Sequence, residues 1–302
     1  MADMDLRFVQ AFHWAVVLGG VTRAAEKLHL TQSAVSARIG SLEAELGIVL
    51  LDRRDRQFRL TVAGQRFHVL ALRLLAMEHE ICQEMGGGPC TDAPLTLRLG
   101  AMESVLHSWL TPWLQRLRED RPGLQLELTV ETTAVLLDQL QRGALDLVLA
   151  SVASPVSGVH TRHLQAMDMV FVGHAQRHTA PGYTLAELVD LQLMTFQRGS
   201  QPHQALWAAL REAGLAGARV HAVSSVSAMV QLVEAGFGVA TLPQAALQRL
   251  GGRHPLRALP CPTPLQPLPV HASYLPDPAS GLTESVLASV VAHLQPGGDT
   301  PV

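Results

Sequence analysis

Residues 19–39 read GGVTRAAEKLHLTQSAVSARI, and this stretch decides the fold of the first sixty residues. Its two glycines end a preceding helical pattern, and Thr22 can then cap a short helix over 23–29. After a break of three or four residues, Thr31 can cap a second helix. The apolar positions of that helix recur at intervals of four, three and four residues, at Val35, Ile39, Leu42 and Leu46. Two helices joined by a tight turn, the second of them amphipathic, predict a helix-turn-helix.

The outer face of this second predicted helix carries small side chains. With the apolar positions turned inward, the outward positions are Ser33, Ser36, Ala37 and Gly40. Small residues let a helix enter the major groove closely and present hydroxyls to base edges. Thr31 and Gln32 stand at the helix N-terminus, where backbone N–H groups favour a phosphate, although Gln32 can instead reach adenine. Arg38 lies on the flank and is expected to contact phosphate. Taken singly, each serine fits a solvated polar face, but together on a helix-turn-helix they predict DNA contact.

Charge is distributed unevenly along the chain. Residues 1–66 carry nine basic against seven acidic side chains, whereas the rest of the chain carries 14 basic against 19 acidic. Four arginines fall within seven residues, at Arg53, Arg54, Arg56 and Arg59. The flanking segments 50–51 and 57–60 can pair as a small ribbon, which would make a wing. A basic head on an acidic body fits a nucleic-acid contact at one end, and a solvated arginine-rich turn explains the same charges.

A long apolar repeat follows the predicted wing. Its members recur at intervals of four and three residues, at Ala63, Phe67, Leu70, Leu74, Met77 and Ile81. This heptad seam ends in the flexible sequence GGGP at 86–89, so the helix lies between domains. Because its seam would otherwise be unburied, we expect a linker helix that dimerises, although a core helix would show a similar pattern.

Beyond residue 94 the pattern changes to alternating strands and helices. Apolar strand patterns at 95–99, 124–130 and 145–150 are separated by helical patterns, and the alternation resumes from 169 to 242. Such βαβ units predict parallel sheets of the α/β class. The proline-rich segment 255–278 contains one plausible strand at 269–275, and a last helix is expected over 283–294.

Composition limits the class of protein. The chain has 302 residues, of which 48% are hydrophobic and 16% charged, which suits two or three domains and excludes a disordered protein. No apolar run reaches the length of a membrane span, and the N-terminus has acids where a secretory signal would be basic, so we expect a cytoplasmic protein.

Cys82, Cys90 and Cys261 form no C-x-x-C pair, which argues against a disulfide framework and a zinc ribbon. The histidines form no full ligand set, so no metal or other cofactor is expected.

Residues 6–66 resemble the N-terminal domain of LysR-type transcriptional regulators. The matching segments are GGVTRAAEKL at 19–28, TQSAVSARI at 31–39, LE at 42–43, LG at 46–47, Arg53 and LTVAG at 60–64. Downstream, GALDLV at 143–148 and GFGVATLP at 236–243 resemble the effector domain of the same family. The chain departs from the family at Ser33, Ala37 and Leu51, where Pro, Arg and Phe are common. The second departure removes a favoured base-reading side chain and makes the target sequence less predictable.

The resemblance implies three parts in the chain. These are a winged helix-turn-helix over 1–62, a linker helix and hinge over 63–90, and an effector domain over 91–302. The effector domain would consist of two Rossmann-like subdomains that resemble periplasmic binding proteins, 91–160 with 266–302 and 161–265, with a small effector between them. The expected function is a transcriptional regulator, not an enzyme, that binds dyad-symmetric double-stranded DNA as a homo-oligomer. The linker helix would form the dimer, and the family implies further association to a tetramer.

Polar residues that follow the predicted strands are candidates for the effector site, because ligands in open α/β sheets bind at the carboxyl ends of strands. The candidates are Glu103, Ser104, Thr132, Thr133, Arg198, Ser200, Gln201 and Ser225. By position, Ser104, Thr132, Ser200 and Ser225 look like the family's effector contacts, although each can simply cap its helix. Arg198 can pair with a carboxylate and Glu103 with an ammonium group, which together suggest an amino-acid-like ligand. A salt bridge between Arg198 and Glu103 is the alternative.

The sequence also bears on two other classes of function, an enzyme and a redox-switched regulator. An enzyme fused to a helix-turn-helix would need a nucleophile elbow, a phosphate loop or a metal set, and the sequence has no G-x-S-x-G and no P-loop. A catalytic pair assembled from distant Ser and His residues stays open, but nothing singles one out. A redox-switched regulator would need a reactive cysteine in the effector body, where only Cys261 lies.

Overall fold

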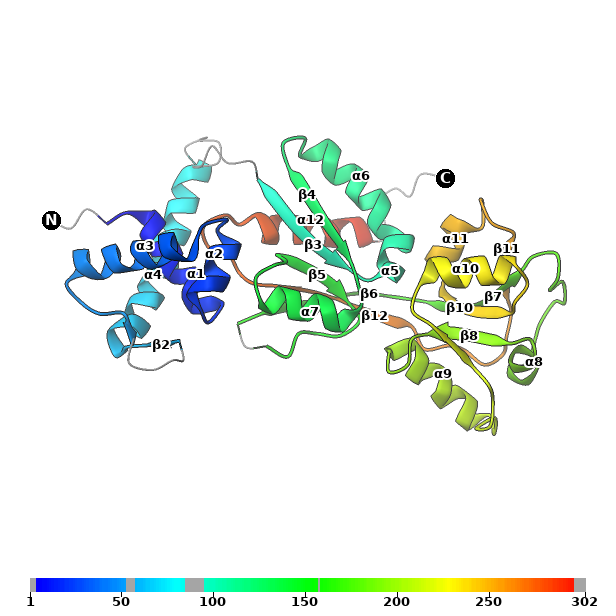
Figure 1. Ribbon diagram of the computed structural model, residues 1–302. Helices are drawn as coiled ribbons and strands as arrows, with labels where there is room; N and C mark the ends of the chain where they lie inside the picture. The colour runs from blue at the N-terminus through cyan, green and yellow to red at the C-terminus, as the bar shows by residue number, and fades with distance from the viewer. Residues whose placement is uncertain (1–3, 53–57, 85–94, 157, 296–302) are drawn as a thin grey trace.

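The computed structural model describes residues 4–52, 58–84, 95–156 and 158–295. Figure 1 shows three parts arranged in a row: a helical head, a first α/β subdomain in the middle and a second α/β subdomain at the far end. The described segments include no helix that combines the length and apolar character needed to cross a membrane.

The head is a winged helix-turn-helix, as predicted. Its elements are α1 (Leu6–Val17), α2 (Val21–Lys27), α3 (Gln32–Leu46), β1 (Leu51–Asp52), β2 (Arg59–Leu60) and α4 (Val62–Glu84). The apolar positions Val35, Ile39 and Leu42 of α3 are buried against α1 and α2. Gly47 ends α3 with a left-handed φ of 68°, a conformation that glycine adopts more readily than residues with a side chain. β1 and β2 pair antiparallel as a small wing.

The apolar seam predicted on α4 divides into two parts. Phe67 and Leu74 pack into the head core beside the buried Ala71 and Leu75, which lie outside the predicted seam. Three seam residues remain in solvent, with exposed fractions of 58% for Leu70, 59% for Met77 and 55% for Ile81, and Ala63 is half-buried. α4 therefore anchors the head with one face and leaves an apolar stripe on another.

The first subdomain is a five-stranded sheet in the order β4-β3-β5-β12-β6. Its strands are β3 (Thr96–Ala101), β4 (Gln125–Val130), β5 (Leu147–Ala150), β6 (His160–Met167) and β12 (Leu268–Tyr274). β3 runs parallel to β4 and β5, whereas β12 is antiparallel to β5 and β6. One face is covered by α7 (Thr133–Gln141) and the other by α6 (Thr111–Asp120) and α12 (Leu282–Leu294). The π-helix η1 (Leu106–Leu110) joins the short α5 (Glu103–Val105) to α6.

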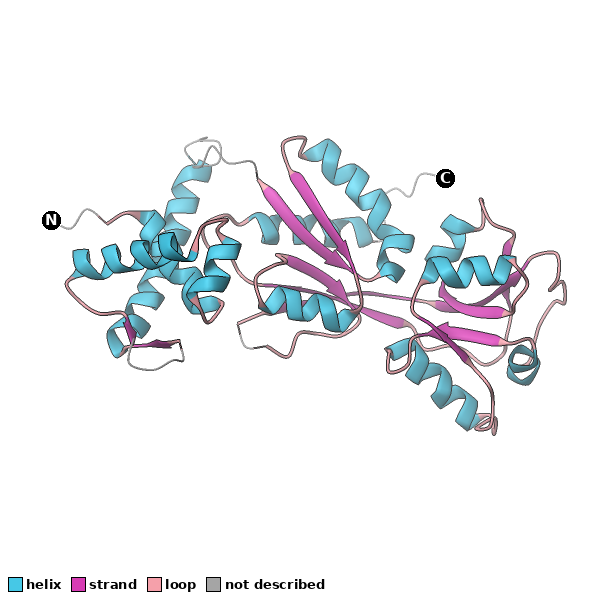
Figure 2. Ribbon diagram, in the orientation of Figure 1, coloured by secondary structure: helices cyan, strands magenta, loops and turns pink. Residues whose placement is uncertain are grey.

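The second subdomain is another five-stranded sheet, in the order β11-β7-β10-β8-β9. Its strands are β7 (Met169–His174), β8 (Leu193–Phe196), β9 (His221–Val223), β10 (Val239–Pro243) and β11 (Leu256–Leu259). Two helices pack on each face: α8 (Leu185–Asp190) and α9 (Gln201–Glu212), and α10 (Val226–Glu234) and α11 (Gln244–Leu250). Figure 2 shows the two sheets connected by extended segments.

Several sequence-based expectations need correction. The predicted boundary at residues 160 and 161 is wrong, because β6 pairs with β12 in the first sheet and the chain crosses at Asp168. β6 was not predicted because its sequence, HTRHLQAM, is mostly polar, as suits an exposed edge strand. Both sheets are mixed rather than purely parallel. The sequence also did not predict β11 and α11, and the helical segment between β3 and β4 is interrupted by η1.

The cysteines differ from expectation in one respect. Cys82, near the end of α4, is disulfide-bonded, although the sequence argued against a disulfide framework. Sequence spacing cannot reveal a single bridge, because pairing depends on where the chain brings the sulfur atoms. Cys261 is a free thiol. Within the described segments, no group of three or more His, Cys, Asp or Glu side chains is arranged to hold a metal ion.

Candidate nucleic-acid interface and effector cleft

The outer face of α3 is open to solvent and has the small side chains that the sequence predicted. Gln32, Ser33, Ser36 and Ala37 are exposed, and Arg38 is half-buried on the flank. Thr31 is the N-cap, and its Oγ1 accepts a hydrogen bond from the backbone N–H of Ala34 at 3.2 Å. The hydroxyls of Thr31 and Ser33 lie 3.0 Å apart. This N-terminus therefore presents two hydroxyls and further backbone N–H groups to a ligand outside the head.

The arginine cluster of the wing falls mostly beyond what can be described. Arg53, Arg54 and Arg56 lie outside the described residues, so the structure gives no position for their side chains. Arg59 lies in β2 and is exposed. It is the one arginine of the cluster that the structure describes, and its exposed position on the wing suits a phosphate contact.

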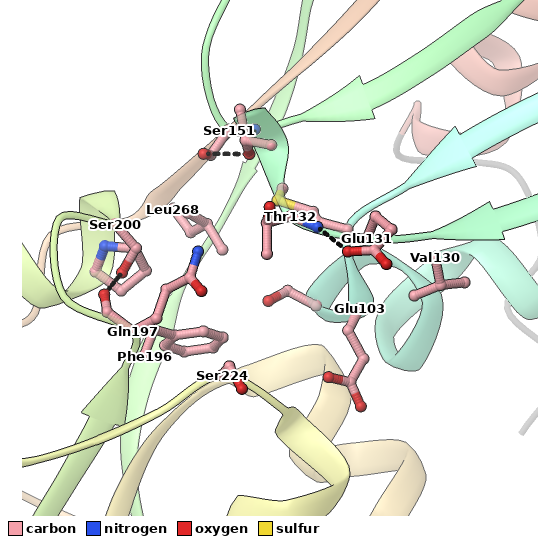
Figure 3. Close-up of a pocket in the computed structure, with 14 residues that line it drawn as sticks. Glu103, Val130, Glu131, Thr132, Ser151, Phe196, Gln197, Ser200, Ser224 and Leu268 are labelled. Atoms are coloured by element: carbon pink, nitrogen blue, oxygen red, sulfur yellow. Dashed lines mark hydrogen bonds between the residues drawn. The ribbon is translucent and has the colours of Figure 1, made fainter. Parts of the chain in front are cut away.

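A cavity of about 230 Å³ lies between the two subdomains, where the carboxyl ends of β3, β4, β5 and β8 converge (Figure 3). Five of the eight predicted effector contacts line it: Glu103, Ser104, Thr132, Thr133 and Ser200. The other three, Arg198, Gln201 and Ser225, do not line it. The rule that ligands bind beyond strand ends thus located the cleft, but it did not show which side chains point inward.

Helix capping explains how several of these hydroxyls are used. Ser200 and Ser225 cap α9 and α10, accepting hydrogen bonds from the backbone N–H groups of His203 and Ala228. Thr132 precedes α7 without capping it, so the first N–H groups of α7 have no side-chain acceptor there. The Thr133 hydroxyl lies 3.0 Å from that of Ser151, and both residues line the cleft.

Glu103 connects the two subdomains. It follows β3 in the first subdomain, and its carboxylate accepts hydrogen bonds from the backbone N–H groups of Val226 at 2.7 Å and Ser227 at 3.0 Å in the second. The hydroxyls of Ser225 and Ser227 donate to the same carboxylate, and His107 lies 3.3 Å away. Burial alone would raise the pKa of Glu103, but the hydrogen bonds from His107 and the α10 N-terminus lower it to about 2.

The alternative of an Arg198–Glu103 salt bridge is wrong, because no ion pair joins these side chains within the described part of the chain and the carboxylate is occupied by α10. Glu103 is therefore a bridge between subdomains rather than a free partner for an ammonium group.

The cleft also contains residues that the sequence did not single out. Glu131 and Gln197 follow β4 and β8 directly, so the rule that ligands bind at strand ends applies to them as well, although they are not among the eight predicted effector contacts. Ser151 directly follows β5 and could have been found by the same rule. Phe196 and Leu268 supply an apolar wall, and no sequence signal separates them from core residues. The lining residues that the structure describes include two carboxylates and no Lys, Arg or His.

Comparisons with known proteins agree with this architecture. Residues 6–65 match the family model described as a bacterial regulatory helix-turn-helix protein of the lysR family, and residues 93–295 match the LysR substrate binding domain. A probable hydrogen peroxide-inducible genes activator from Streptomyces viridosporus is 36% identical over 74% of this chain and 73% of its own length. The regulator ArgP of Photobacterium profundum is 30% identical, covering 82% of this chain and 84% of its own.

Solved structures show the same fold over nearly the whole chain. A full-length OxyR variant from Pseudomonas aeruginosa superposes with a TM-score of 0.61 at 21% sequence identity. The match covers 97% of this chain and 95% of that structure. The curated relatives are described as transcriptional regulators or gene activators rather than enzymes.

Proposed function

Because the chain belongs to the LysR family of bacterial transcriptional regulators, we propose that it binds a dyad-symmetric promoter site in the cytoplasm and responds to an amino-acid-like effector. As a member of this family it binds DNA through the head and senses a small molecule in the substrate-binding domain. The exposed face of α3, with its small side chains and capped N-terminus, carries the DNA-binding part of the proposal. The parts we assign are 1–62, 63–90 and 91–302, with the second subdomain at 168–265.

In this proposal, α3 enters the major groove and its residues divide into two roles. Ser33, Ser36 and Ala37 approach base edges, because they are the small exposed side chains on the outer face. Thr31, Gln32 and Arg38 contact phosphates and fix the register of the helix. Arg53, Arg54 and Arg56 of the wing segment add phosphate contacts on charge grounds alone.

The test is selection of duplexes from a random DNA pool by the full-length protein at two salt concentrations. We expect an interrupted inverted repeat, with binding that falls steeply as salt rises. Ser36→Arg should abolish this sequence preference through a clash in the groove. Glu45→Arg is the matched control, because Glu45 is exposed in the last turn of the same helix, on the side opposite Ser36. Retention of the site preference by Ser36→Arg would contradict the placement of α3.

Two surfaces support assembly beyond the monomer. The exposed stripe of α4 would pair two chains, so that each head reads one half-site. A second surface lies at the edge strand β4, where Leu126, Leu128 and Val130 are exposed beside an apolar groove against α6. An unpaired apolar edge is a surface that proteins usually cover, so we assign it to the contact that makes a tetramer from two dimers.

The effector proposal rests on the chemistry of the cleft. The uncapped N-terminus of α7 and the hydroxyls of Thr132 and Ser104 suit a carboxylate, whereas the Ser200 hydroxyl donates to the Gln197 carbonyl and caps α9. Glu131 lies at the rim with its carboxylate making one long hydrogen bond of 3.3 Å, to the backbone N–H of Thr132, and is suited to an ammonium group. This assignment replaces Glu103 and Arg198 in the roles expected from the sequence. The small cavity favours a ligand with few heavy atoms.

A further inference from the structure

The DNA-binding head is attached to the effector body by an ion pair that bridges distant parts of the chain. Lys27 at the end of α2 places its Nζ 2.5 Å from Oδ1 of Asp146, which directly precedes β5. Arg98 of β3 donates to both oxygens of the same carboxylate, at 2.7 Å and 3.2 Å. The Lys27 ammonium also lies 4.5 Å from the ring centroid of Trp14 in α1. We call these three charged residues the head–body triad.

The three charged side chains of the triad are buried, so separating the opposite charges would cost free energy. The side chains of Lys27, Asp146 and Arg98 keep only 14%, 9% and 10% of their exposure. Burial would raise the pKa of Asp146, but the two cations offset this and lower it below its usual value. Undocking the head would separate the Lys27 ammonium from the buried carboxylate, and removing Asp146 would leave both cations without their anion, so the docked position of the head is preferred over nearby alternatives.

Apolar contacts seal the same interface. Leu18, which ends α1, is buried against the turn at Gly143, where an added Cβ would lie 2.8 Å from the Leu18 side chain. The core of the head and the core beneath α7, including Leu136 and Leu140, form one continuous cluster. The head and the first subdomain therefore share a core and are not merely tethered by α4.

Two adjacent strands run from the triad to the effector cleft. Arg98 lies five residues before Glu103, and Asp146 lies five residues before Ser151. Both Glu103 and Ser151 line the cleft. β3 and β5 are parallel and paired with each other, and five residues of strand span about 16 Å. A shift of these strands at the cleft would therefore also move Arg98 and Asp146, the two members of the triad that belong to the effector body.

We propose that the head–body triad is a latch that couples the effector cleft to the position of the DNA-binding head through β3 and β5. In a dimer, the latch would fix the spacing between the two heads, and effector binding would change the free energy of docking. The coupling to an effector rests on the proposed function, whereas the latch itself is a property of the monomer fold.

The test uses Lys27→Met in the full-length protein, followed by amide hydrogen exchange without effector or DNA. Methionine keeps an unbranched apolar side chain at this position and removes the charge that meets Asp146 and the Trp14 ring. We expect exchange to rise about tenfold or more in α1 and α2 and also in 96–104 and 147–151, across the predicted route. Glu26→Gln is the matched control, because Glu26 is exposed on the same helix. An increase confined to the head, an even increase that includes α9, or no increase overturns the proposal.

A conservative variant guards against general destabilisation. Lys27→Arg keeps the charge, so it should restore most of the wild-type protection if the latch is ionic. If Lys27→Arg behaves like Lys27→Met, the ionic latch is refuted. Because this readout needs no DNA, its failure is distinguishable from failure of the proposed function, which the duplex selection tests separately. Where wild-type protein prefers one half-site spacing, Lys27→Met should accept several, and an unchanged spacing preference counts against the latch.

Discussion

His13 of α1 is buried and faces His68 of α4, in a position where a charged imidazole would be unfavourable. Its ring stacks on that of His68 with centroids 5.4 Å apart, and its Nδ1 lies 3.2 Å from Nε2 of His68. Its Nε2 has no hydrogen-bond partner among the described residues. Burial, together with the neighbouring His68 and Lys27, lowers the pKa of His13 to about 3. The head therefore folds with His13 neutral.

This lowered pKa predicts an acid-sensitive head. The unfolded chain takes up the proton near pH 6.5 and the folded chain only near pH 3, so stability is complete above pH 6.5 and falls between these values. From pH 6.5 to pH 4.5 the loss from this group should be about 2 kcal/mol. His13→Phe should remove most of that slope in urea unfolding of the full chain. His29→Asn is the control, since His29 is exposed and Asn tolerates its positive φ of 53°. An unchanged slope in His13→Phe would contradict the assignment.

Glu103 predicts a second effect of a single residue, this time between subdomains. Glu103→Gln keeps the shape but removes the charge that faces the N-terminus of α10, so we expect a loss of about 1–2 kcal/mol after solvent screening. Because the pKa of Glu103 is lowered to about 2, its contribution is present above the ordinary value near 4.5 and is lost as pH falls toward 2. Thermal unfolding at pH 7 and pH 3 measures the difference between variant and wild type, which should shrink at pH 3. Glu131→Gln is the control, and an equal effect of both variants would contradict the bridge.

At the scale of elements, α4 shows how one helix serves two partners. Ala71 and Leu75 face the head core, while Leu70, Met77 and Ile81 form the exposed stripe. A three-and-four repeat in sequence marks apolar positions, but it does not say which of them meet the same partner. The free stripe is the part of the predicted seam that remains available for a second chain.

Met77→Glu should therefore dissociate the dimer that we propose. A carboxylate placed in an apolar helix pair would cost about 3 kcal/mol or more, which weakens the dimer at least about 100-fold. Sedimentation velocity of wild type and variant over a range of concentrations measures this change directly. Glu80→Gln serves as the control, because Glu80 is exposed on α4 and outside the stripe. If Met77→Glu sediments as wild type does, the α4 stripe is not the dimer contact.

Elements with strong periodic patterns were predictable from the sequence, and edge elements were not. α1 to α3 follow from apolar spacing and from Thr31 and Gly47 as caps, so the winged head was found with its recognition face. β6 was not predicted because an exposed edge strand need not alternate between polar and apolar residues. β11 was not predicted because it has only four residues in a proline-rich region. The boundary error at residue 160 follows directly from the missed β6, since its pairing decides which sheet the segment joins.

At the scale of the whole molecule, contacts between distant segments could not be predicted from a single sequence. Lys27 and Asp146 are 119 residues apart, and Glu103 and Val226 are 123 apart. Each charged residue alone is compatible with a solvated surface, and only the fold brings the partners together. The same limit applied to the cleft, where Arg198 was expected as the cation that binds a carboxylate but does not line the cavity. The cleft is consequently more acidic than the sequence suggested.

This acidity leads to a prediction for the whole molecule. If Glu131 binds an ammonium group and the α7 N-terminus binds a carboxylate, a free amino acid should stabilise the full chain, whereas its N-acetyl and amide forms should not. A ligand at 100 times its dissociation constant adds about 2.7 kcal/mol, which raises the melting temperature by about 5–10 °C in a domain of this size. Thermal unfolding with the common amino acids, each also as N-acetyl and amide derivatives, measures this.

The variant Glu131→Gln separates the proposed ion pair from nonspecific stabilisation. It should lose the response to the stabilising amino acid, because the ammonium group would no longer meet a charge. Glu119→Gln is the matched control, since Glu119 is exposed on α6 and does not line the cavity. Stabilisation by the N-acetyl form as strong as by the free amino acid would show that no ammonium is bound. An undiminished response in Glu131→Gln would remove Glu131 from the site, and the cleft would then bind through the α7 N-terminus and its hydroxyls alone.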